Sequence, residues 1–187
     1  MKKYFVISDI HGDFNKLQSA IDLFVRDKYY KLLILGDVLY HGPRNDLPSG
    51  YNVKKCIELL NLYNDKIICV KGNCEAEVDQ MVLNFKIRNS YSFIFNHVKF
   101  YLTHGTHLNK ENNHYSKNSV VLYGHTHVYK IEKINDIFYI NPGSISLPKV
   151  NKECSFITFD KNSIQIHDLS TNYILEEISF NTIKGEE

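Results

Sequence analysis

The sequence of 187 residues lacks long hydrophobic runs, a strong excess of charge and paired cysteine spacings. Its longest apolar stretches have the length of a strand, which excludes a transmembrane helix of about 20 residues. The formal net charge of +1 gives no electrostatic reason to expect duplex nucleic acid or a membrane surface as the main partner. We therefore expect neither, and the partner has to be inferred from a site.

The four cysteines show no Cys-Xaa-Xaa-Cys or zinc-ribbon spacing. The N-terminus has Lys2 and Lys3 but no apolar signal-peptide segment before the first strand. These two absences predict a cytoplasmic protein with reduced, mostly buried cysteines. Since no stretch resembles an interdomain linker, we expect residues 1–187 to form a single domain.

Five apolar runs along the chain each end in Asp, Asn or His. These residues are Asp9 and His11, Asp37, Asn73, His104, and His125 with His127. The runs have the β-branched and aromatic composition of buried strands. Because ligands of α/β sheets bind outside the carboxyl ends of strands, this pattern predicts a site at one sheet edge.

Between these runs, helical spacing of apolar residues predicts helices at about 14–27 and 53–60 and a short one from 74 to 83. From residue 85 onward the apolar runs are strand-like, and Asn96-His97 falls at a hairpin position. A first half of α/β type and a strand-rich second half predict two sheets packed face to face with helices outside.

Taken one at a time, these polar residues could simply cap helices or form turns. Taken together, one dinuclear metal site explains all five strand ends. In an extended segment, His125 and His127 point the same way and could face two ions about 3.5 to 4 Å apart. Imidazole with carboxylate suits manganese, iron or zinc, and seven ligands are too many for one closed tetrahedral structural site.

In this order, these motifs resemble the signature of the calcineurin-like metallophosphoesterase superfamily. The motifs are Asp9 with His11, Gly36-Asp37, Gly72-Asn73, His104-Gly105 and Gly124-His125-Thr126-His127. Within that superfamily, four further stretches are similar to the YfcE-type bacterial phosphodiesterases. They are Leu35-Gly36-Asp37-Val38-Leu39, His41-Gly42-Pro43-Arg44-Asn45, Gly72-Asn73-Cys74-Glu75 and Asn141-Pro142-Gly143-Ser144.

The resemblance implies a four-layer α-β-β-α sandwich, in which two packed mixed sheets carry helices on both outer faces. It also implies two divalent transition-metal ions, manganese foremost, with iron, zinc or nickel as alternatives. Asp9, His11 and His127 would hold one ion. Asn73, His104 and His125 would hold the other, with Asp37 bridging. A hydroxide activated by the two ions would then hydrolyse a small phosphodiester.

Two flanking residues complete the hypothesis. Arg44 could bind a non-bridging phosphate oxygen or a second phosphate-ester group, because guanidinium binds phosphate bidentately. Cys74 stands where many members of the superfamily carry His, so catalysis by Asn73 and Cys74 would favour good leaving groups, since a thiol is a weaker acid than imidazolium. Alternatively, Cys74 only packs, and Arg44 is only a solvated loop charge.

A different class of function, a protein-binding scaffold of the same fold with little activity, also stays open. In such scaffolds metal ligands are replaced, whereas here every ligand position is filled. The abundant Tyr and Phe leave room for a homo-oligomer.

Overall fold

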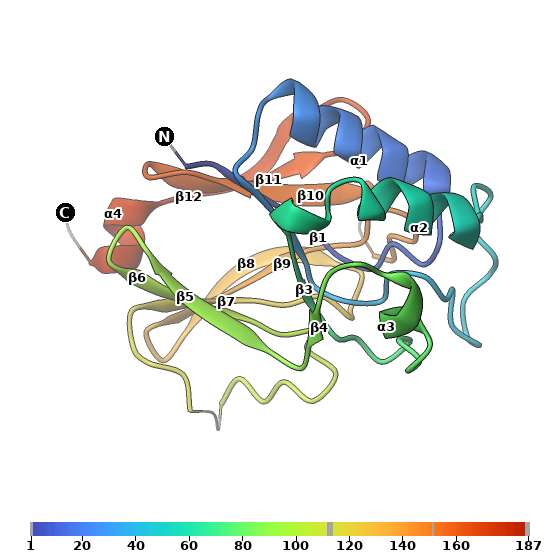
Figure 1. Cartoon of the computed structure of the whole chain (residues 1–187). Coiled ribbons are helices and arrows are strands. Elements are labelled where there is room, and N and C mark those ends of the chain that lie inside the picture. The colour runs from blue at the N-terminus through green and yellow to red at the C-terminus, as the bar shows by residue number, and fades with distance from the viewer. Residues whose placement is uncertain (1, 112–113, 151, 186–187) are drawn as a thin grey trace.

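The computed structural model describes residues 2–111, 114–150 and 152–185, and they form two facing β-sheets (Figure 1). The larger sheet has the strand order β12-β11-β10-β1-β2-β3-β4. Its strands are β1 Tyr4–Ile7, β2 Lys31–Ile34, β3 Ile67–Val70, β4 Ile87–Arg88, β10 Ser155–Phe159, β11 Ser163–Asp168 and β12 Ile174–Ser179. The smaller sheet has the order β5-β6-β7-β9-β8. Its strands are β5 Tyr91–Phe95, β6 Val98–Leu102, β7 Ser119–Leu122, β8 Tyr129–Ile134 and β9 Ile137–Pro142.

Both sheets are mixed, and their parallel strands form one side of the larger sheet and the centre of the smaller one. Strands β1 to β4 run parallel, whereas β10, β11 and β12 add antiparallel pairings on the other side of β1. In the smaller sheet, β6, β7 and β9 are parallel, and hairpins add β5 and β8 at the two edges. Parallel strands place their carboxyl ends at one edge, which is where the segments after β1, β2 and β3 meet.

An apolar core rich in aromatic rings fills the space between the sheets. The rings of Tyr4 and Phe159 stack with centroids 4.6 Å apart, and Phe100 stacks on Phe159 at 4.9 Å. Such pairs contribute beyond their buried area. The core therefore holds the two sheets in a fixed relation, and with them the loops at their edge.

Two amphipathic helices, α1 (Phe14–Arg26) and α2 (Val53–Asn61), cover the outer face of the larger sheet (Figure 1). Each begins at a side chain that accepts a hydrogen bond from the first turn, Asp13 from Lys16 N and Asn52 from Lys55 N. Both helices confirm the prediction from apolar spacing. Each helix in the described part of the chain is too short or too polar to cross a membrane.

The third predicted helix is much shorter than expected. Instead of spanning 74–83, α3 covers Asp79–Val82. Before α3 the chain forms turns, and the Glu75 carboxylate accepts hydrogen bonds from the backbone N–H groups of Val38 and Gly72. These bonds attach the segment before α3 to the loop after β2.

The predicted sandwich of two packed mixed sheets is confirmed, but its second outer layer differs from the expectation. The described residues on the outer face of the smaller sheet form no helix. Leu108 and Tyr115, from the segment after β6, pack instead against Val121 and Tyr139. That segment has no helical repeat of apolar side chains. The short helix α4 (Phe180–Lys184) inserts Phe180 and Ile183 into the core between the sheets.

Candidate metal centre

Five of the predicted ligands lie buried together where the central strands end. Asp9 and His11 follow β1, Asp37 follows β2, His104 follows β6 and His127 follows β7. None of their side chains is more than 3% exposed. Buried carboxylates and imidazoles in this number need charged partners or a bound ion.

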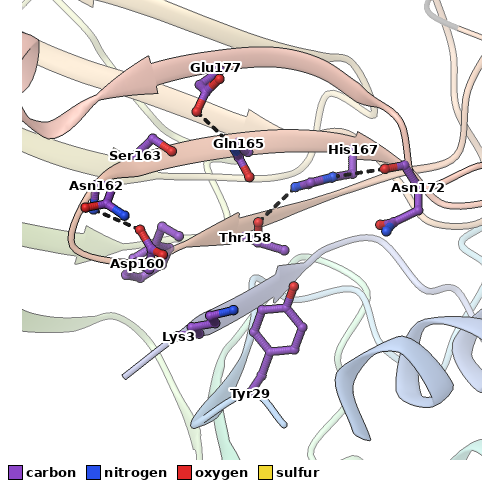
Figure 2. A pocket seen from close by; sticks show the side chains of 11 residues that line it. Lys3, Tyr29, Thr158, Asp160, Asn162, Ser163, Gln165, His167, Asn172 and Glu177 are labelled. Atoms are coloured by element: carbon purple, nitrogen blue, oxygen red, sulfur yellow. Dashed lines mark hydrogen bonds between the residues drawn. The ribbon is translucent and has the colours of Figure 1, made fainter. Parts of the chain in front are cut away.

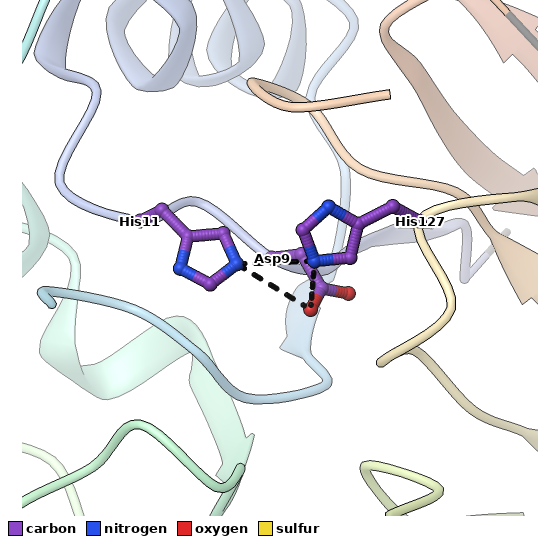
Figure 3. Close-up of side chains that lie close together, drawn as sticks. All are labelled: Asp9, His11 and His127. Carbon is purple, nitrogen blue, oxygen red and sulfur yellow. Dashed lines mark hydrogen bonds and ion pairs between the residues drawn. The ribbon is translucent and has the colours of Figure 1, made fainter. Parts of the chain in front are cut away.

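Asp9, His11 and His127 form the first group. Their ligand atoms lie close enough to share one ion. The Nε2 atoms of His127 and His11 lie 3.3 and 3.8 Å from Asp9 Oδ1, and 3.2 Å from each other. Figure 3 shows both rings directed at the Asp9 carboxylate.

Asp37, His104 and Asn73 form the second group. His104 Nε2 lies 3.4 Å from Asp37 Oδ2 and 3.1 Å from Asn73 Oδ1. The same carboxylate oxygen of Asp37 lies 3.8 Å from His11 Nε2, so Asp37 faces both groups. The half-buried ring of His125 lies beside that of His104, with centroids 5.2 Å apart. All seven predicted ligand residues therefore gather at this edge.

Backbone carbonyls fix the orientation of three imidazoles. The Nδ1–H groups of His11, His104 and His127 donate to the carbonyl oxygens of Tyr40 at 2.8 Å, Leu35 at 2.7 Å and Leu147 at 2.6 Å. A carbonyl only accepts, so Nδ1 carries the proton in each ring. In the neutral ring the lone pair then lies on Nε2, which faces the carboxylates, and this is the arrangement typical of metal-binding histidines.

The Asp9 carboxylate provides the test of whether these residues fit a cation. Its Oδ2 atom accepts from Ser8 Oγ at 2.6 Å and from His125 N at 3.0 Å. Its Oδ1 atom is buried and has no hydrogen-bond partner among the described residues. An unpaired buried carboxylate oxygen is costly. A divalent cation between Asp9 and the two Nε2 atoms would satisfy it, so the donor set fits.

The backbone at the site is strained. Positive φ angles occur at Asp9 (53°), His11 (49°), Asp37 (55°), His125 (68°) and His127 (58°). For residues other than glycine, this conformation costs on the order of 1 to 3 kcal/mol each. The rest of the fold therefore holds the ligand residues in a conformation that the isolated chain would avoid.

Charge pairing within the cluster shifts several pKa values. Burial alone would raise the pKa of Asp37, but His104 and the Cys74 N–H lower it to about 2. Burial would lower the pKa of His104, whereas Asp37 and Asp9 raise it to about 9. For His11, burial prevails over the nearby carboxylates and lowers the pKa. Asp37 consequently stays ionised at neutral pH and attracts cations.

Glu75 is a structural member of the site whose role sequence reasoning missed. It is 8% exposed, and its carboxylate accepts from Val38 N at 2.6 Å and from Gly72 N. In return, Asp37 Oδ1 accepts from Cys74 N at 2.8 Å. These reciprocal bonds join the loop after β2 to the loop after β3. The only signal in the sequence is an acidic residue two positions after a predicted ligand.

A cavity of about 400 Å³ opens over the cluster. The predicted residues that line it are Asp37, Arg44, Asn73, Cys74, His125 and His127. Cys74 Sγ accepts a hydrogen bond from Asn73 Nδ2 at 3.3 Å. Burial, with the charge of Asp37, raises the pKa of the Cys74 thiol to about 12, so this thiol is a weaker acid than an ordinary cysteine. Lys149 also lines this cavity, and sequence reasoning missed it.

A second polar cavity, of about 360 Å³, lies on strands β10 and β11 (Figure 2). Thr158 Oγ1 and His167 Nε2 are hydrogen-bonded there at 2.9 Å, and Gln165 Nε2 donates to Glu177 Oε1 at 2.8 Å. Its polar side chains are therefore partly paired with each other. None of its residues belongs to the groups that could hold an ion among the described residues.

Residues 2–163 match the model of the calcineurin-like phosphoesterase superfamily domain. The chain belongs to this superfamily. It is 39% identical to phosphodiesterase YfcE of Escherichia coli strain K12 over 183 residues, which is 97% of this chain and 100% of the relative. It is 28% identical to a phosphodiesterase of Methanocaldococcus jannaschii over 147 residues, 74% of this chain and 81% of that protein.

The fold agrees with this superfamily. The solved structure of the E. coli phosphoesterase Yfce superposes with a TM-score of 0.92 at 39% identity, covering 96% of this chain and 100% of that one. The prediction of a calcineurin-like, metal-dependent phosphoesterase is thereby confirmed for the family, the fold and the enzyme class. A requirement for divalent metal follows from the superfamily together with the Asp and His cluster.

Proposed function

We propose that this phosphoesterase is a phosphodiesterase that works with two divalent ions. Asp9, His11 and His127 would hold one ion. Asn73, His104 and His125 would hold the other, and Asp37 would contact both. The carboxylate and imidazole donors favour manganese, with iron, zinc or nickel as alternatives. We also propose a cytoplasmic location and a small phosphate-ester substrate.

The reaction consumes one water for each diester. The water oxygen bonds to phosphorus, one P–O ester bond breaks, and the products are a phosphomonoester and an alcohol. The bound ions supply Lewis acidity toward water and phosphate oxygens. The chain's own contribution is position: the carbonyl-anchored imidazoles and the Glu75 carboxylate hold the ligand loops in place before substrate arrives.

Two further residues act on the substrate in this proposal. The exposed Arg44 guanidinium contacts an anionic group of the substrate. Cys74, with Asn73 beside it, faces the leaving group. A protonated thiol is a weak acid, so the leaving oxygen receives little help, and we expect the rate to fall as the pKa of the leaving alcohol rises. A rate that does not depend on that pKa would contradict this role of Cys74.

The observation that carries the proposal is the unpartnered Asp9 Oδ1 facing two Nε2 atoms. The relatives' names, both phosphodiesterases, support diesters over monoesters. The test is hydrolysis of bis(p-nitrophenyl) phosphate against p-nitrophenyl phosphate, with manganese, with zinc, or with a chelator. We expect metal-dependent hydrolysis with preference for the diester. Full activity in the chelated protein would refute the metal mechanism, and preference for the monoester would refute the diester assignment.

A further inference from the structure

Two cationic side chains, Arg44 and Lys149, line the cavity above the metal-ligand cluster. They come from separate parts of the chain, one after β2 and the other between β9 and β10. Both side chains are exposed, and neither forms a hydrogen bond or ion pair with any residue that the structure describes. Their charges are therefore available to a ligand in the cavity.

The segment that carries Arg44 also orients a ligand imidazole. His11 Nδ1–H donates to the carbonyl of Tyr40, four positions before Arg44. Just past the arginine, Asn45 closes the turn, because its Nδ2 donates to the His41 carbonyl at 2.7 Å. Arg44 therefore lies in a turn that is held by internal hydrogen bonds and is attached to the cluster through the bond between His11 and Tyr40.

The segment that carries Lys149 is attached to the cluster in the same manner. His127 Nδ1–H donates to the carbonyl of Leu147, and Lys149 N donates to the carbonyl of His127 at 3.2 Å. These two hydrogen bonds hold the backbone of Lys149 beside His127. The two segments hold the first ligand group between them and each adds one cation.

The cavity has more positive charge and more room than a single phosphate needs. Although the whole chain has a net charge of +1, Asp37 is the only acidic residue among the described ones that lines this cavity, and its carboxylate already faces His104 and Cys74 N. The volume of about 400 Å³ lies within the range of small-molecule sites, roughly 300 to 1,000 Å³. A phosphodiester group carries one negative charge, which is less than the charge of the two cationic side chains together.

We propose that Arg44 and Lys149 form a subsite for a second anionic group of the substrate. This rests on the proposed function, because it names the class of diester that the site selects. The substrate is a phosphodiester whose non-leaving substituent carries a carboxylate or a phosphate. The planar guanidinium of Arg44 can bind either anion with two hydrogen bonds, and the Lys149 ammonium adds a second charge.

Three diesters with the same p-nitrophenolate leaving group test this. The other substituent is ethyl, carboxyethyl or phosphoethyl, so leaving-group chemistry is constant. In the wild-type manganese enzyme we expect kcat/KM for at least one anionic diester to exceed that for the ethyl diester by about tenfold, chiefly through KM. Lys149→Gln should reduce this ratio severalfold, and Lys149→Arg should restore it. Rising salt should lower the ratio.

Lys152→Gln is the matched control, because Lys152 is exposed and lies outside this cavity. We expect it to keep the wild-type ratio. If wild type hydrolyses all three diesters equally well, or if Lys149→Gln keeps the full ratio, the subsite is refuted while the phosphodiesterase stands. If wild type with metal hydrolyses none of the three, the proposed function itself fails. The larger of the two anionic ratios identifies carboxylate or phosphate as the preferred group.

Discussion

The cavity at the sheet edge and the cavity on β10 and β11 are of similar volume and differ in how their polar atoms are satisfied. On β10 and β11, Thr158 bonds to His167, and no buried side-chain oxygen or nitrogen of that cavity is unpaired among the described residues (Figure 2). At the sheet edge, Asp9 Oδ1 is buried, faces the Nε2 atoms of His11 and His127, and has no hydrogen-bond partner among the described residues (Figure 3). Polarity alone does not distinguish a ligand site, whereas an unsatisfied buried carboxylate oxygen does.

The backbone differs between the two cavities as well. Of the described residues that line the cavity on β10 and β11, Asn172 alone has a positive φ, in the turn before β12. At the sheet edge, five predicted ligands share it. Strain is kept where the arrangement of side chains matters more than local stability.

The largest effect that would sharpen this contrast is expected from Asp37→Asn. This change removes the carboxylate that faces both ligand groups, and we expect kcat for diester hydrolysis to fall by roughly 1,000-fold or more, since such metal interactions are worth several kcal/mol. The control is Asp160→Asn in the cavity on β10 and β11, which should keep wild-type kcat. Equal losses in both variants would erase the distinction.

Manganese should stabilise the protein through the sheet-edge cluster only. At a free concentration 100 times Kd, a bound ion adds about 2.7 kcal/mol, or roughly 5 to 10 °C in Tm for a chain of this size. Differential scanning calorimetry should show the shift in wild type and in His167→Ala. In Asp9→Asn we expect most of it to disappear. A shift that survives in Asp9→Asn would place the ion elsewhere.

Glu75→Gln should act at a distance from any ion. The amide can accept only one of the two backbone hydrogen bonds that the carboxylate accepts, so the loops after β2 and β3 loosen. We expect manganese affinity, measured by calorimetric titration, to fall by about 10- to 100-fold. The exposed Glu77 provides the matched control, and Glu77→Gln should bind manganese as wild type does. Unchanged affinity in Glu75→Gln would contradict this role of Glu75.

The smallest effect is expected from Asp168→Asn, and on stability alone. Burial would raise the pKa of Asp168, but hydrogen bonds from Ser170 and Thr171 outweigh it and lower the pKa. The ionised form is therefore stabilised in the folded state, fully above pH about 4 and progressively less as the pH falls. Denaturant unfolding should show Asp168→Asn less stable by about 1 kcal/mol at pH 7. The difference should narrow near pH 3, and a pH-independent difference would contradict this. Diester hydrolysis should not change.

The sequence was sufficient to predict which residues gather at the site, because each one directly follows an apolar run. Strand composition and the parallel arrangement of α/β units carry that information locally. The same holds for the hairpin turn at Asn96-His97, where both residues have positive φ. Single-domain organisation of 1–187 and homo-oligomerisation stay predictions.

What the sequence did not reveal depends on contacts between distant segments. From the sequence, Glu75 is predicted to lie in a helix. The structure shows that its carboxylate accepts a hydrogen bond from the N–H group of Val38. Lys149 has no feature in the sequence that links it to the site. The hydrogen bond from His127 to the Leu147 carbonyl, which brings Lys149 to the cavity, is visible only in the structure. The outer layer of the smaller sheet was expected to be helical, but Leu108 and Tyr115 cover it without helical periodicity. In each case the observed structure depends on a contact between distant segments, which the local sequence pattern does not determine.

The carbonyls of Tyr40, Leu35 and Leu147 that anchor the imidazoles belong to the main chain. Most substitutions of those three side chains would leave the carbonyl oxygens in place. The orientation of the imidazole rings therefore does not depend on the identity of these three residues. In a relative without catalytic activity, we therefore expect the Asp or His ligands to be replaced while the backbone around them stays the same.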